Sequence, residues 1–512
     1  MNTLLDLERG SHLALALLPE LILTAWAMLL VLLAAFRWRR PGSQRFVGWV
    51  SLVGILAAIG AAIWMWTRDY GLDGIAGSMA VDPFRWAATI VILTGAALST
   101  IVAIGYLERE GIEIPEFHAL IQFAAVGCLF MVSGADLLII FLGLETMSVS
   151  IYVLAGINRR SIASAEAALK YFLLGAFASA FLLYGIALLY GATGSTKLGI
   201  IGFQTVHSDT GVQAMLWSGI ALLVIGFGFK VAAVPFHMWA PDVYDGAPTP
   251  VTAFMAATVK AAALGALVRV LLQGLAMTQE QWGPVVWWLA TVTMVIGNLL
   301  ALAQRSLKRM LAYSSIAHAG YILSALVPGS VNGAAAFLFY LMFYTLTTVV
   351  AFTVLTARGR AGERDLTLDD LAGLGDRDPM LALAMAVAML SLLGFPGTAG
   401  FIGKWYVLGA ITGAGYTTLA VILVLTSVVS AGYYLPVIMA MYMKPPQEAP
   451  HAPLVGLSRV VTAMIALVTA ATIAFGVWPG PALRSARDGA SGFLPRQVNV
   501  ATPGMRSPPQ AR

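Results

Sequence analysis

Residues 229–244 read FKVAAVPFHMWAPDVY, an apolar run that contains Lys230 and Pro235. Proline removes a backbone donor and kinks or ends a helix, so this stretch predicts a helix that breaks shortly after its lysine. Residues 394–404 read GFPGTAGFIGK and repeat the pattern, with a glycine–proline break before Lys404. We therefore expect two broken helices, each with a lysine beside the break.

The composition around these stretches is that of a membrane protein. Of 512 residues, 59% are hydrophobic and 11% are charged, whereas soluble domains carry roughly 25% charged residues. Apolar stretches of about 18 residues or more recur along the chain, and each can cross a bilayer core of roughly 30 Å. We expect an all-α polytopic membrane protein embedded in a lipid bilayer. The net charge of +5 is small for this length and does not indicate nucleic-acid binding.

A window reading finds about 14 transmembrane segments. They lie near residues 13–36, 46–66, 84–106, 117–133, 135–156, 166–194, 213–239, 248–275, 285–303, 309–328, 332–357, 380–411, 415–442 and 456–478. The broken segments are the seventh and the twelfth, and two interrupted segments five spans apart are typical of inverted repeats. The predicted organisation is helices 1–3 in residues 1–116, five-helix repeats in 117–275 and 285–442, helix 14 in 443–480, and a disordered tail in 481–512.

The basic residues predict an orientation. Most loop lysines and arginines lie in alternate loops, beginning with residues 37–45 and including Arg159 and Arg160. The positive-inside rule places these loops in the cytoplasm. Both chain termini are then expected on the outer side of the membrane.

Few ionisable side chains lie inside the predicted spans. The charges that lie deep within the apolar spans are Glu145, Lys170, Lys230, Lys260, Arg269 and Lys404, with His318 as the one deep histidine. A basic residue at mid-membrane costs about 2.5–3.5 kcal/mol on insertion scales, so such residues usually serve a function. A buried lysine has its pKa drawn down from about 10.4, and a nearby carboxylate draws it back up. A row of lysines bridged by water is therefore expected to pass protons, with Glu145 as the partner of Lys230.

Some members of this row have a second interpretation. Lys170 lies near the start of its span, where its long side chain can reach the membrane interface. His318 can act as a proton relay or as a hydrogen-bonded packing residue. Arg269 lies nearer the outer end of its span and is expected to be an interface anchor. A purely structural role for the lysines also stays open.

Redox chemistry is not expected in this chain. The single cysteine, Cys128, cannot hold an iron–sulfur cluster alone, and the six histidines offer no facing pair for haem. The sequence contains no phosphate-binding loop of the G-x-x-x-x-G-K-[ST] type and no dinucleotide fingerprint. We expect no cofactor or metal here, so the energy must come from a gradient or from partner subunits.

Four stretches resemble a known superfamily. Residues 229–244, GAPTPV at 246–251, SSIAHAGY at 314–321 and residues 394–404 are similar to the antiporter-like subunits of respiratory complex I and of multi-subunit cation/proton antiporters. The resemblance covers essentially all predicted helices. It implies that Glu145 and Lys230 form an ion pair, that Lys260 is a central relay, and that Lys404 lies near the outer exit of a proton path.

Within that superfamily the chain looks most like the N-type subunits of bacterial NADH:quinone oxidoreductase. LPELIL at 18–23 and PDVYDGAP at 241–248 are similar to that family, and Lys404 stands where M-type subunits carry a glutamate. The resemblance implies a bacterial inner-membrane subunit with M, K and J types as neighbours. NADH, FMN, iron–sulfur clusters and quinone are then expected in partner subunits. A component of a multi-subunit cation/proton antiporter is the alternative.

Overall fold

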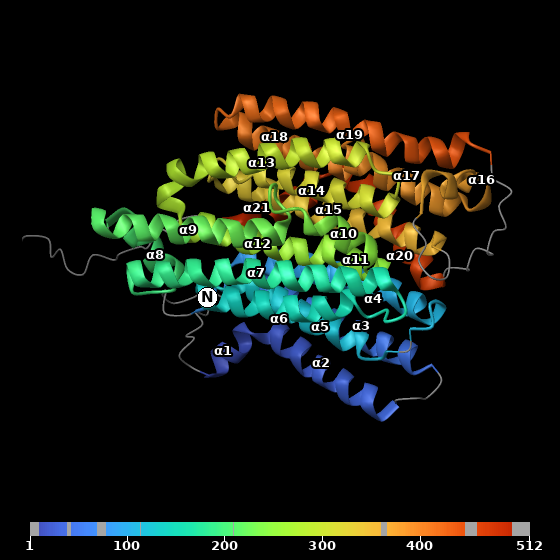
Figure 1. Ribbon diagram of the computed structural model, residues 1–512, viewed down its shortest axis with the longest axis horizontal. Helices are drawn as coiled ribbons and strands as arrows, with labels where there is room; N and C mark the ends of the chain where they lie inside the picture. The colour runs from blue at the N-terminus through green and yellow to red at the C-terminus, as the bar shows by residue number, and fades with distance from the viewer. Residues whose placement is uncertain are drawn as a thin grey trace, which may run out of the picture.

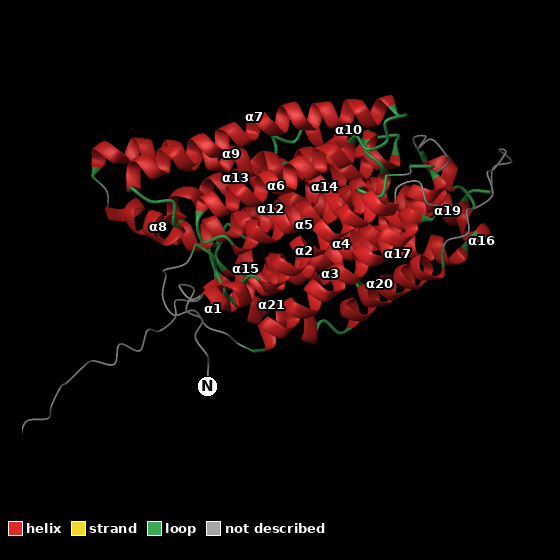
Figure 2. Ribbon diagram, turned by 90° about the horizontal axis from the view of Figure 1, so that it is seen from below, coloured by secondary structure: helices red, strands yellow, loops and turns green. Residues whose placement is uncertain are grey.

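The computed structural model is an all-helical bundle, as the sequence predicts (Figure 2). It describes residues 10–37, 42–68, 78–112, 114–207, 209–359, 366–445 and 458–493. Within these ranges the only β-structure is a pair of isolated β-bridges, one between Met79 and Gly134 and one between Asp136 and Lys197. Most of the long helices run roughly along the longest axis of the molecule in Figure 1.

The N-terminal helices form one edge of the bundle. Their bounds are α1 Gly10–Ala16, α2 Leu18–Arg37, α3 Ser43–Thr67 and α4 Pro83–Arg109. Helix α2 packs against α3 and α5, and α3 packs against α4. Helix α4 begins at Pro83, a favoured first position, after Asp82, whose side chain accepts a hydrogen bond from the Arg85 amide. This N-cap fixes where α4 starts.

The next part of the chain holds the first broken helix. Its long elements are α5 Phe117–Ser133, α6 Leu137–Ala155, α7 Ile162–Thr193, α8 Leu198–His207, α9 Thr210–Val231, α10 Trp239–Gly246, α11 Thr249–Phe254 and α12 Lys260–Arg269. Two π-helical turns, η1 Met255–Val259 and η2 Val270–Gly274, interrupt the predicted span 248–275. The 3-10 turn η3 Ala276–Thr278 follows. The sequence reasoning did not anticipate the π-helical turns or the short helix α8.

The remaining helices hold the second break. They are α13 Gln279–Leu302, α14 Leu307–Ser324, α15 Val331–Arg358, α16 Leu374–Arg377, α17 Pro379–Leu393, α18 Ala399–Gly413, α19 Thr417–Met443, α20 Arg459–Val477 and α21 Gly480–Ala490. The 3-10 turns η4 Leu368–Leu371 and η5 Ser491–Phe493 complete the described elements. In Figure 1, α19 and α2 lie at opposite edges of the bundle.

Both predicted breaks are confirmed. Helix α9 ends at Val231, where Ala232 adopts a left-handed conformation with φ 59°, and α10 begins only at Trp239. Helix α17 ends at Leu393 before Gly394, with φ 85°, and α18 begins at Ala399. The backbone groups released at each break must find other partners, which makes these places suited to polar chemistry.

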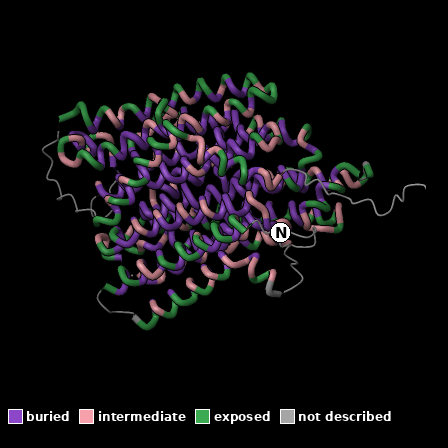
Figure 3. Tube along the Cα trace, turned by 180° about the vertical axis from the view of Figure 1, so that it is seen from behind, coloured by how far each residue is buried: buried purple, intermediate pink, exposed green. Residues whose placement is uncertain are grey.

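The core of the bundle runs through α4, residues 249–274 and α15. All residues of the apolar stretch within 249–274 are buried, whereas only 33% of the residues are buried in the corresponding stretches of α2 and of α19. Figure 3 shows the same contrast between a buried interior and exposed outer helices. The ionisable residues of 249–274 therefore lie inside the protein rather than against lipid.

Eleven helices in the described part of the chain are long and apolar enough to cross a membrane, and two shorter apolar helices are Phe117–Ser133 and Pro379–Leu393. Each predicted segment contains helix. The total of about 14 spans and the division into two repeats stay predictions.

The predicted disordered tail at 481–512 is wrong at its start. Helix α21 spans Gly480–Ala490 and packs against α4 and α15. A Cβ at Gly489 would lie 2.9 Å from the Cβ of Ala87 and 2.8 Å from Leu338, so small residues let this helix approach closely. The low hydrophobicity of 480–490 concealed a helix that depends on tertiary contacts. Residues 494–512 lie outside the described ranges.

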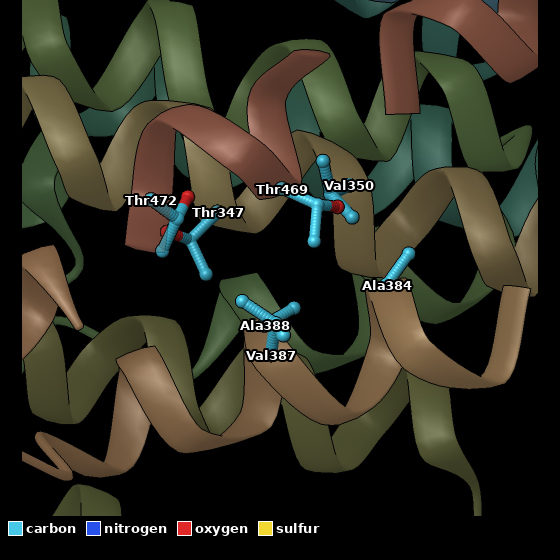
Figure 4. Close-up of a pocket in the computed structure, with 7 residues that line it drawn as sticks. All are labelled: Thr347, Val350, Ala384, Val387, Ala388, Thr469 and Thr472. Carbon is cyan, nitrogen blue, oxygen red and sulfur yellow. The ribbon is translucent and has the colours of Figure 1, made fainter. Parts of the chain in front are cut away.

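A small void lies between α15, α17 and α20 (Figure 4). It has no room for a water molecule, whereas small-molecule sites enclose roughly 300–1,000 Å³. It is lined by Thr347, Val350, Ala384, Val387, Ala388, Thr469 and Thr472. The buried ionisable side chains are therefore the stronger candidates for a functional site.

Candidate functional site

Lys230 occupies the last turn of α9, directly before the first break. Its side chain is buried, with 2% exposed. The ammonium donates to the Ser148 hydroxyl at 2.8 Å and lies 3.4 Å from the Tyr152 hydroxyl, both on α6. It also lies 5.5 Å from the ring centroids of Tyr152 and Tyr171, within cation–π range. Neutral oxygens and aromatic rings thus surround this lysine.

Glu145 does not form the predicted direct ion pair with Lys230. Within the described residues no carboxylate oxygen lies within 4.0 Å of the Lys230 ammonium. Glu145 lies one helical turn before Ser148, and its Oε1 atom is buried without a partner in the described structure. The hydroxyl of Ser148 donates to the Leu144 carbonyl at 2.5 Å while accepting from Lys230. Ser148 therefore occupies the place that the carboxylate was expected to take.

Lys260 begins α12 immediately after the π-helical turn η1. Its side chain is 2% exposed. The ammonium donates to the Ser315 carbonyl at 2.7 Å and to the Ser315 hydroxyl, which also accepts from Tyr344 at 2.8 Å. The wider π-helical turn sets the direction of the residue that follows it, and π-bulges are frequent at functional sites. Lys260 is thereby joined to α14 and α15.

His318 lies in α14 between two tyrosine hydroxyls. Tyr340 is 2.8 Å from Nδ1 and Tyr434 is 3.1 Å from Nε2. The Tyr434 hydroxyl also bonds the Ser314 hydroxyl. The ring is packed against Tyr344, with centroids 5.2 Å apart. Both nitrogens thus have partners, so the histidine can donate through one nitrogen and accept through the other.

Lys404 lies in α18 and reaches back across the second break. Its ammonium donates to the Leu393 carbonyl at 2.9 Å and to the Ser427 hydroxyl at 2.7 Å, and lies 4.5 Å from the Tyr321 ring centroid. Leu393 is the last residue of α17. Because the helix stops there, its carbonyl lacks the amide donor that a continuing helix would supply. The break therefore creates the acceptor that holds this lysine.

The second half of the row is joined by hydroxyl groups and rings. From Lys260 the contacts pass through Ser315 and Tyr344 to His318. The His318 and Tyr321 rings lie 5.5 Å apart by centroid, and Tyr321 underlies Lys404. No hydrogen bond between described residues joins Lys230 to Lys260 directly. Hydrogen bonds and ring contacts together therefore connect Lys260 to Lys404, whereas in the described part of the chain no hydrogen bond connects Lys230 to Lys260.

Asn298 and Tyr433 support the Lys404 end of the row. The Asn298 amide donates to the Tyr321 hydroxyl at 2.9 Å and to the Met294 carbonyl at 2.7 Å, and accepts from Tyr433 at 2.8 Å. These bonds fix the ring that faces the lysine. Sequence reasoning missed the hydroxyl and amide groups because it considered only ionisable residues. The four-residue spacing of Tyr340 and Tyr344, which places both on one helix face, was a usable signal.

Lys170 does not join the buried row. Its side chain is 41% exposed and its ammonium pairs with Asp242 at 2.8 Å and Glu166 at 2.6 Å. Arg309 contacts the other oxygen of Asp242 at 2.8 Å. Burial alone would raise the pKa of Asp242, but Lys170 and Arg309 hold it below its ordinary value of 3.8. The cluster ties α7, α10 and α14 together at the end where α7 begins.

The interface-anchor prediction for Arg269 is wrong. The side chain is fully buried and its guanidinium binds both oxygens of Asp82, at 2.8 and 3.0 Å. It also donates to the Val132 carbonyl at 2.7 Å and to Gln273 at 2.9 Å. Burial raises the pKa of Asp82, yet the charge of Arg269 outweighs this and holds that pKa below 3.8. Because residues 249–274 lie in the core, the arginine has no route to the interface.

A second buried ion pair was missed. Arg85 donates to Glu20 at 2.7 Å, and the two side chains are 0% and 2% exposed. Arg85 also donates to the Ala80 and Ala16 carbonyls, at 2.9 and 2.8 Å. Both residues lie near the ends of predicted spans, where a charge is ordinary. Only the tertiary structure brings Arg85 at the start of α4 against Ala16 of α1 and Glu20 of α2.

The described residues contain no cluster of three or more histidine, cysteine, aspartate or glutamate side chains that could hold a metal ion. The arrangement holds three ammonium groups in an apolar bundle, each bonded to neutral oxygens. Hydroxyls and an imidazole lie between two of them. Such groups can pass protons, because each can donate one hydrogen bond while accepting another.

Comparisons with known proteins show the family of the chain. Residues 134–430 match the family model described as NADH:quinone oxidoreductase/Mrp antiporter, TM. NADH-quinone oxidoreductase subunit N of Gemmatimonas aurantiaca is 46% identical over 483 residues, which cover 92% of each chain. The subunit N of Chloroflexus aggregans is 44% identical and covers 91% of this chain and 94% of its own.

Chains in solved structures are also similar to this protein. A chain in the structure of respiratory complex I from Thermus thermophilus with bound aureothin is 38% identical, with a TM-score of 0.78. That match covers 92% of this chain and all of the other. A chain of the Mrp complex from Dietzia sp. DQ12-45-1b has a TM-score of 0.80 at 20% identity, over 94% of this chain and 97% of the other. The latter likeness shows a shared fold.

Proposed function

The chain belongs to the NADH-quinone oxidoreductase subunit N family, and from that membership we propose that its buried lysines relay protons. It is a membrane-arm subunit of a proton-translocating complex I. The observation that carries the proposal is the environment of Lys230, Lys260 and Lys404. Each ammonium is buried and, among the described residues, bonded only to hydroxyl or carbonyl oxygens.

Neutral ligands leave the charge of a buried ammonium poorly compensated. Removing a charge from water is expensive unless an opposite charge and hydrogen bonds replace the hydration. Hydroxyls, carbonyls and aromatic faces replace only part of it. The charged and neutral forms of such a lysine then lie close in free energy, and a charge that arrives nearby decides between them.

Glu145 is suited to make that decision for Lys230. Its carboxylate lies one helical turn from Ser148, the hydroxyl that accepts from the lysine. A movement of α6 or a change of the carboxylate's charge alters the field at Lys230 without breaking a direct salt bridge. We propose that this pair is the first switch of the relay.

From Lys260 onward the proposed relay follows hydrogen bonds to Ser315 and Tyr344, and water molecules bridge the ring contacts that lead on to His318 and Lys404. A proton leaving Lys260 meets the Ser315 and Tyr344 hydroxyls, then the imidazole of His318. Lys404 receives it beside Tyr321 at the second break. In each step one N–H or O–H bond breaks as another forms, and no electron moves within this chain. Lys170 takes no part, because its ion pairs hold it at the surface.

Redox chemistry is assigned to partner subunits. We propose that NADH, FMN, iron–sulfur clusters and quinone are bound there, and that M-, K- and J-type subunits are the neighbours in the membrane arm. The cation/proton antiporter alternative is less favoured, since the relatives at 44–46% identity are subunit N proteins. The similarity to the Mrp complex chain, at 20% identity, shows only a shared fold.

For the topology we propose a multi-pass protein of the bacterial inner membrane with the arginine-rich loops in the cytoplasm. Cys128 is buried and is the single native cysteine, so introduced cysteines give a clean label. Arg159→Cys and Ala414→Cys, at exposed positions on opposite ends of the bundle, should react with an impermeant maleimide from opposite sides. Labelling of Arg159→Cys from the periplasm would reverse the orientation.

The relay is tested with single substitutions in the complete complex reconstituted in vesicles. We expect Lys260→Ala and Lys404→Ala to lose proton pumping per electron, because each removes a proton carrier. Lys444→Ala is the matched control, since Lys444 is exposed and pairs with Asp369 at 3.0 Å. Unchanged pumping in both buried-lysine variants, with assembly intact, would assign these lysines a structural role instead.

A further inference from the structure

A second set of buried polar side chains lies between α3, α4 and α5, apart from the lysine row. Gln44 and Ser51 come from α3, Thr100 from α4, and His118 and Gln122 from α5. All five are buried, with His118, Gln122, Ser51 and Thr100 at 0% exposure. We call this set the α3–α5 seam. It begins at the end of the bundle where α3 and α5 start.

The three helices meet closely at His118. A Cβ added at Gly48 of α3 would lie 2.8 Å from the His118 Nε2 atom and 2.5 Å from Ile104 of α4. One helical turn further along α5, Gln122 donates to the Ser51 carbonyl at 2.9 Å and to its hydroxyl at 3.2 Å. The polar groups therefore face one another inside the seam rather than lipid.

Most of these groups have no protein partner. Both ring nitrogens of His118, both amide atoms of Gln44, the Gln122 Oε1 atom and the Thr100 hydroxyl are buried without a hydrogen bond in the described structure. More than about 90% of buried polar groups in proteins are paired with protein or ordered water. Leaving one unpaired costs about 1–3 kcal/mol. A small ligand that both donates and accepts meets this need, and water is the ligand with that chemistry.

The polar face of α4 extends the seam toward Lys260. Ser99 adjoins Thr100, and its hydroxyl is also buried without a partner. One turn nearer the middle, a Cβ at Gly95 would lie 2.6 Å from the Thr258 hydroxyl and 3.0 Å from Thr345. The Thr345 hydroxyl is likewise unpartnered.

These last two threonines adjoin the lysine site. Thr258 stands two residues before Lys260 in the π-helical turn η1. Thr345 follows Tyr344, which donates to the hydroxyl that holds the lysine. The seam thus extends from one end of α3 to the helical turns that carry Lys260 and Tyr344.

We propose that single water molecules bridging the unpartnered groups of the α3–α5 seam form a proton path that leads from that end of the bundle to Lys260. The seam binds these water molecules through the side chains of His118, Gln122, Thr100 and Ser99. At His118 one nitrogen takes a proton from a water molecule while the other nitrogen passes its proton to the next, so the ring ends neutral and no electron moves. Glu116, whose Oε2 atom is buried without a described partner, stands beside the entrance. This path rests on the proposed role of Lys260.

The direct test is the density of the complete complex at a resolution that shows ordered water. We expect water peaks bridging the His118 ring, the Gln122 Oε1 atom and the Thr100 hydroxyl. A seam in which these atoms contact only carbon, with no water peak, would overturn the proposal.

The functional test uses His118→Leu and Thr100→Val in the reconstituted complex. Both should lower proton pumping per electron, while NADH oxidation by a soluble acceptor, which reports assembly, stays unchanged. Thr353→Val is the matched control, because the buried Thr353 hydroxyl already donates to Val349 of its own helix at 2.6 Å. Normal pumping in both seam variants overturns the path.

Lys260→Ala separates this proposal from the relay. If Lys260→Ala loses pumping and the seam variants do not, the relay stands and the path fails. If Lys260→Ala also pumps normally, the relay itself fails. Thermal stability gives a second readout, since replacing unpaired groups in a dry seam would raise the Tm of His118→Leu, whereas loss of bound water lowers it or leaves it unchanged.

Discussion

Exchange of Asp82 for alanine removes two stabilising contacts at once. Asp82 caps α4 through the Arg85 amide at 2.8 Å and binds the guanidinium of Arg269 through both oxygens. The Arg269 side chain is 0% exposed and that of Asp82 is 15% exposed. Asp82→Ala therefore leaves a buried guanidinium bonded only to Val132 and Gln273.

The expected magnitude follows from these two contacts. Loss of an N-cap costs about 0.5–2 kcal/mol, and an unpaired charge left by breaking a buried pair costs about 3–5 kcal/mol. Asp82→Ala should lose most of that sum. The double variant Asp82→Ala/Arg269→Met should lose less, because no charge is left unpaired. Asp82→Asn keeps a cap acceptor and should fall between the two.

The assay is thermal unfolding of the detergent-solubilised complex, followed by retention of this subunit. A double-mutant cycle isolates the coupling of the two side chains. Because Asp82 has a lowered pKa, its contribution is complete above its ordinary value of 3.8 and is lost as the pH falls through the lowered pKa. The difference between native protein and Asp82→Ala should therefore be constant from about pH 6 to 8. If the double variant were no more stable than Asp82→Ala, the reasoning about the stranded charge would be refuted.

Two further substitutions test the second break and the surface cluster. In Gly400→Ala the new Cβ would lie 1.9 Å from the Ser391 carbonyl, so α18 cannot close on α17 and the assembled subunit should be lost, as immunoblots of purified complex would show. Gly409→Ala on the same helix meets no atom within 4 Å and should assemble normally; equal assembly of both variants would contradict the account. Asp242→Asn removes the negative charge that Lys170 and Arg309 share and replaces one of its two acceptor oxygens with a donor, so it should lower the Tm modestly, since the side chains are partly exposed. Because the pKa of Asp242 is lowered, that Tm difference should persist down to about pH 4 and vanish at lower pH; a difference that disappears near pH 6 would be inconsistent with these ion pairs.

Some features of the site were accessible from single residues. A lysine in an apolar span has few acceptable surroundings, so Lys230, Lys260 and Lys404 could be selected without any partner being known. Their burial is confirmed, at 2%, 2% and 6% exposure. Their role in a relay stays a prediction.

Other features needed the contacts themselves. Ser148 and Lys230 are 82 residues apart in the chain, and Ser315 and Lys260 are 55 apart. Serine is common in membrane helices, and nothing local distinguishes one that binds lysine. For this reason the Glu145 pairing was expected where a hydroxyl is found.

The sequence by itself determined the class of the protein and the places where its helices break. Apolar length, the scarcity of charge and the prolines after Lys230 and before Lys404 act within one segment, so they can be evaluated one segment at a time. Tertiary structure alone decided which charges are paired and which lie among neutral oxygens. Arg269 became a core residue and Lys170 a surface one because burial depends on which helices surround a span. That is a property of the packed bundle, and it determines which of the charged residues are candidates for the proposed relay.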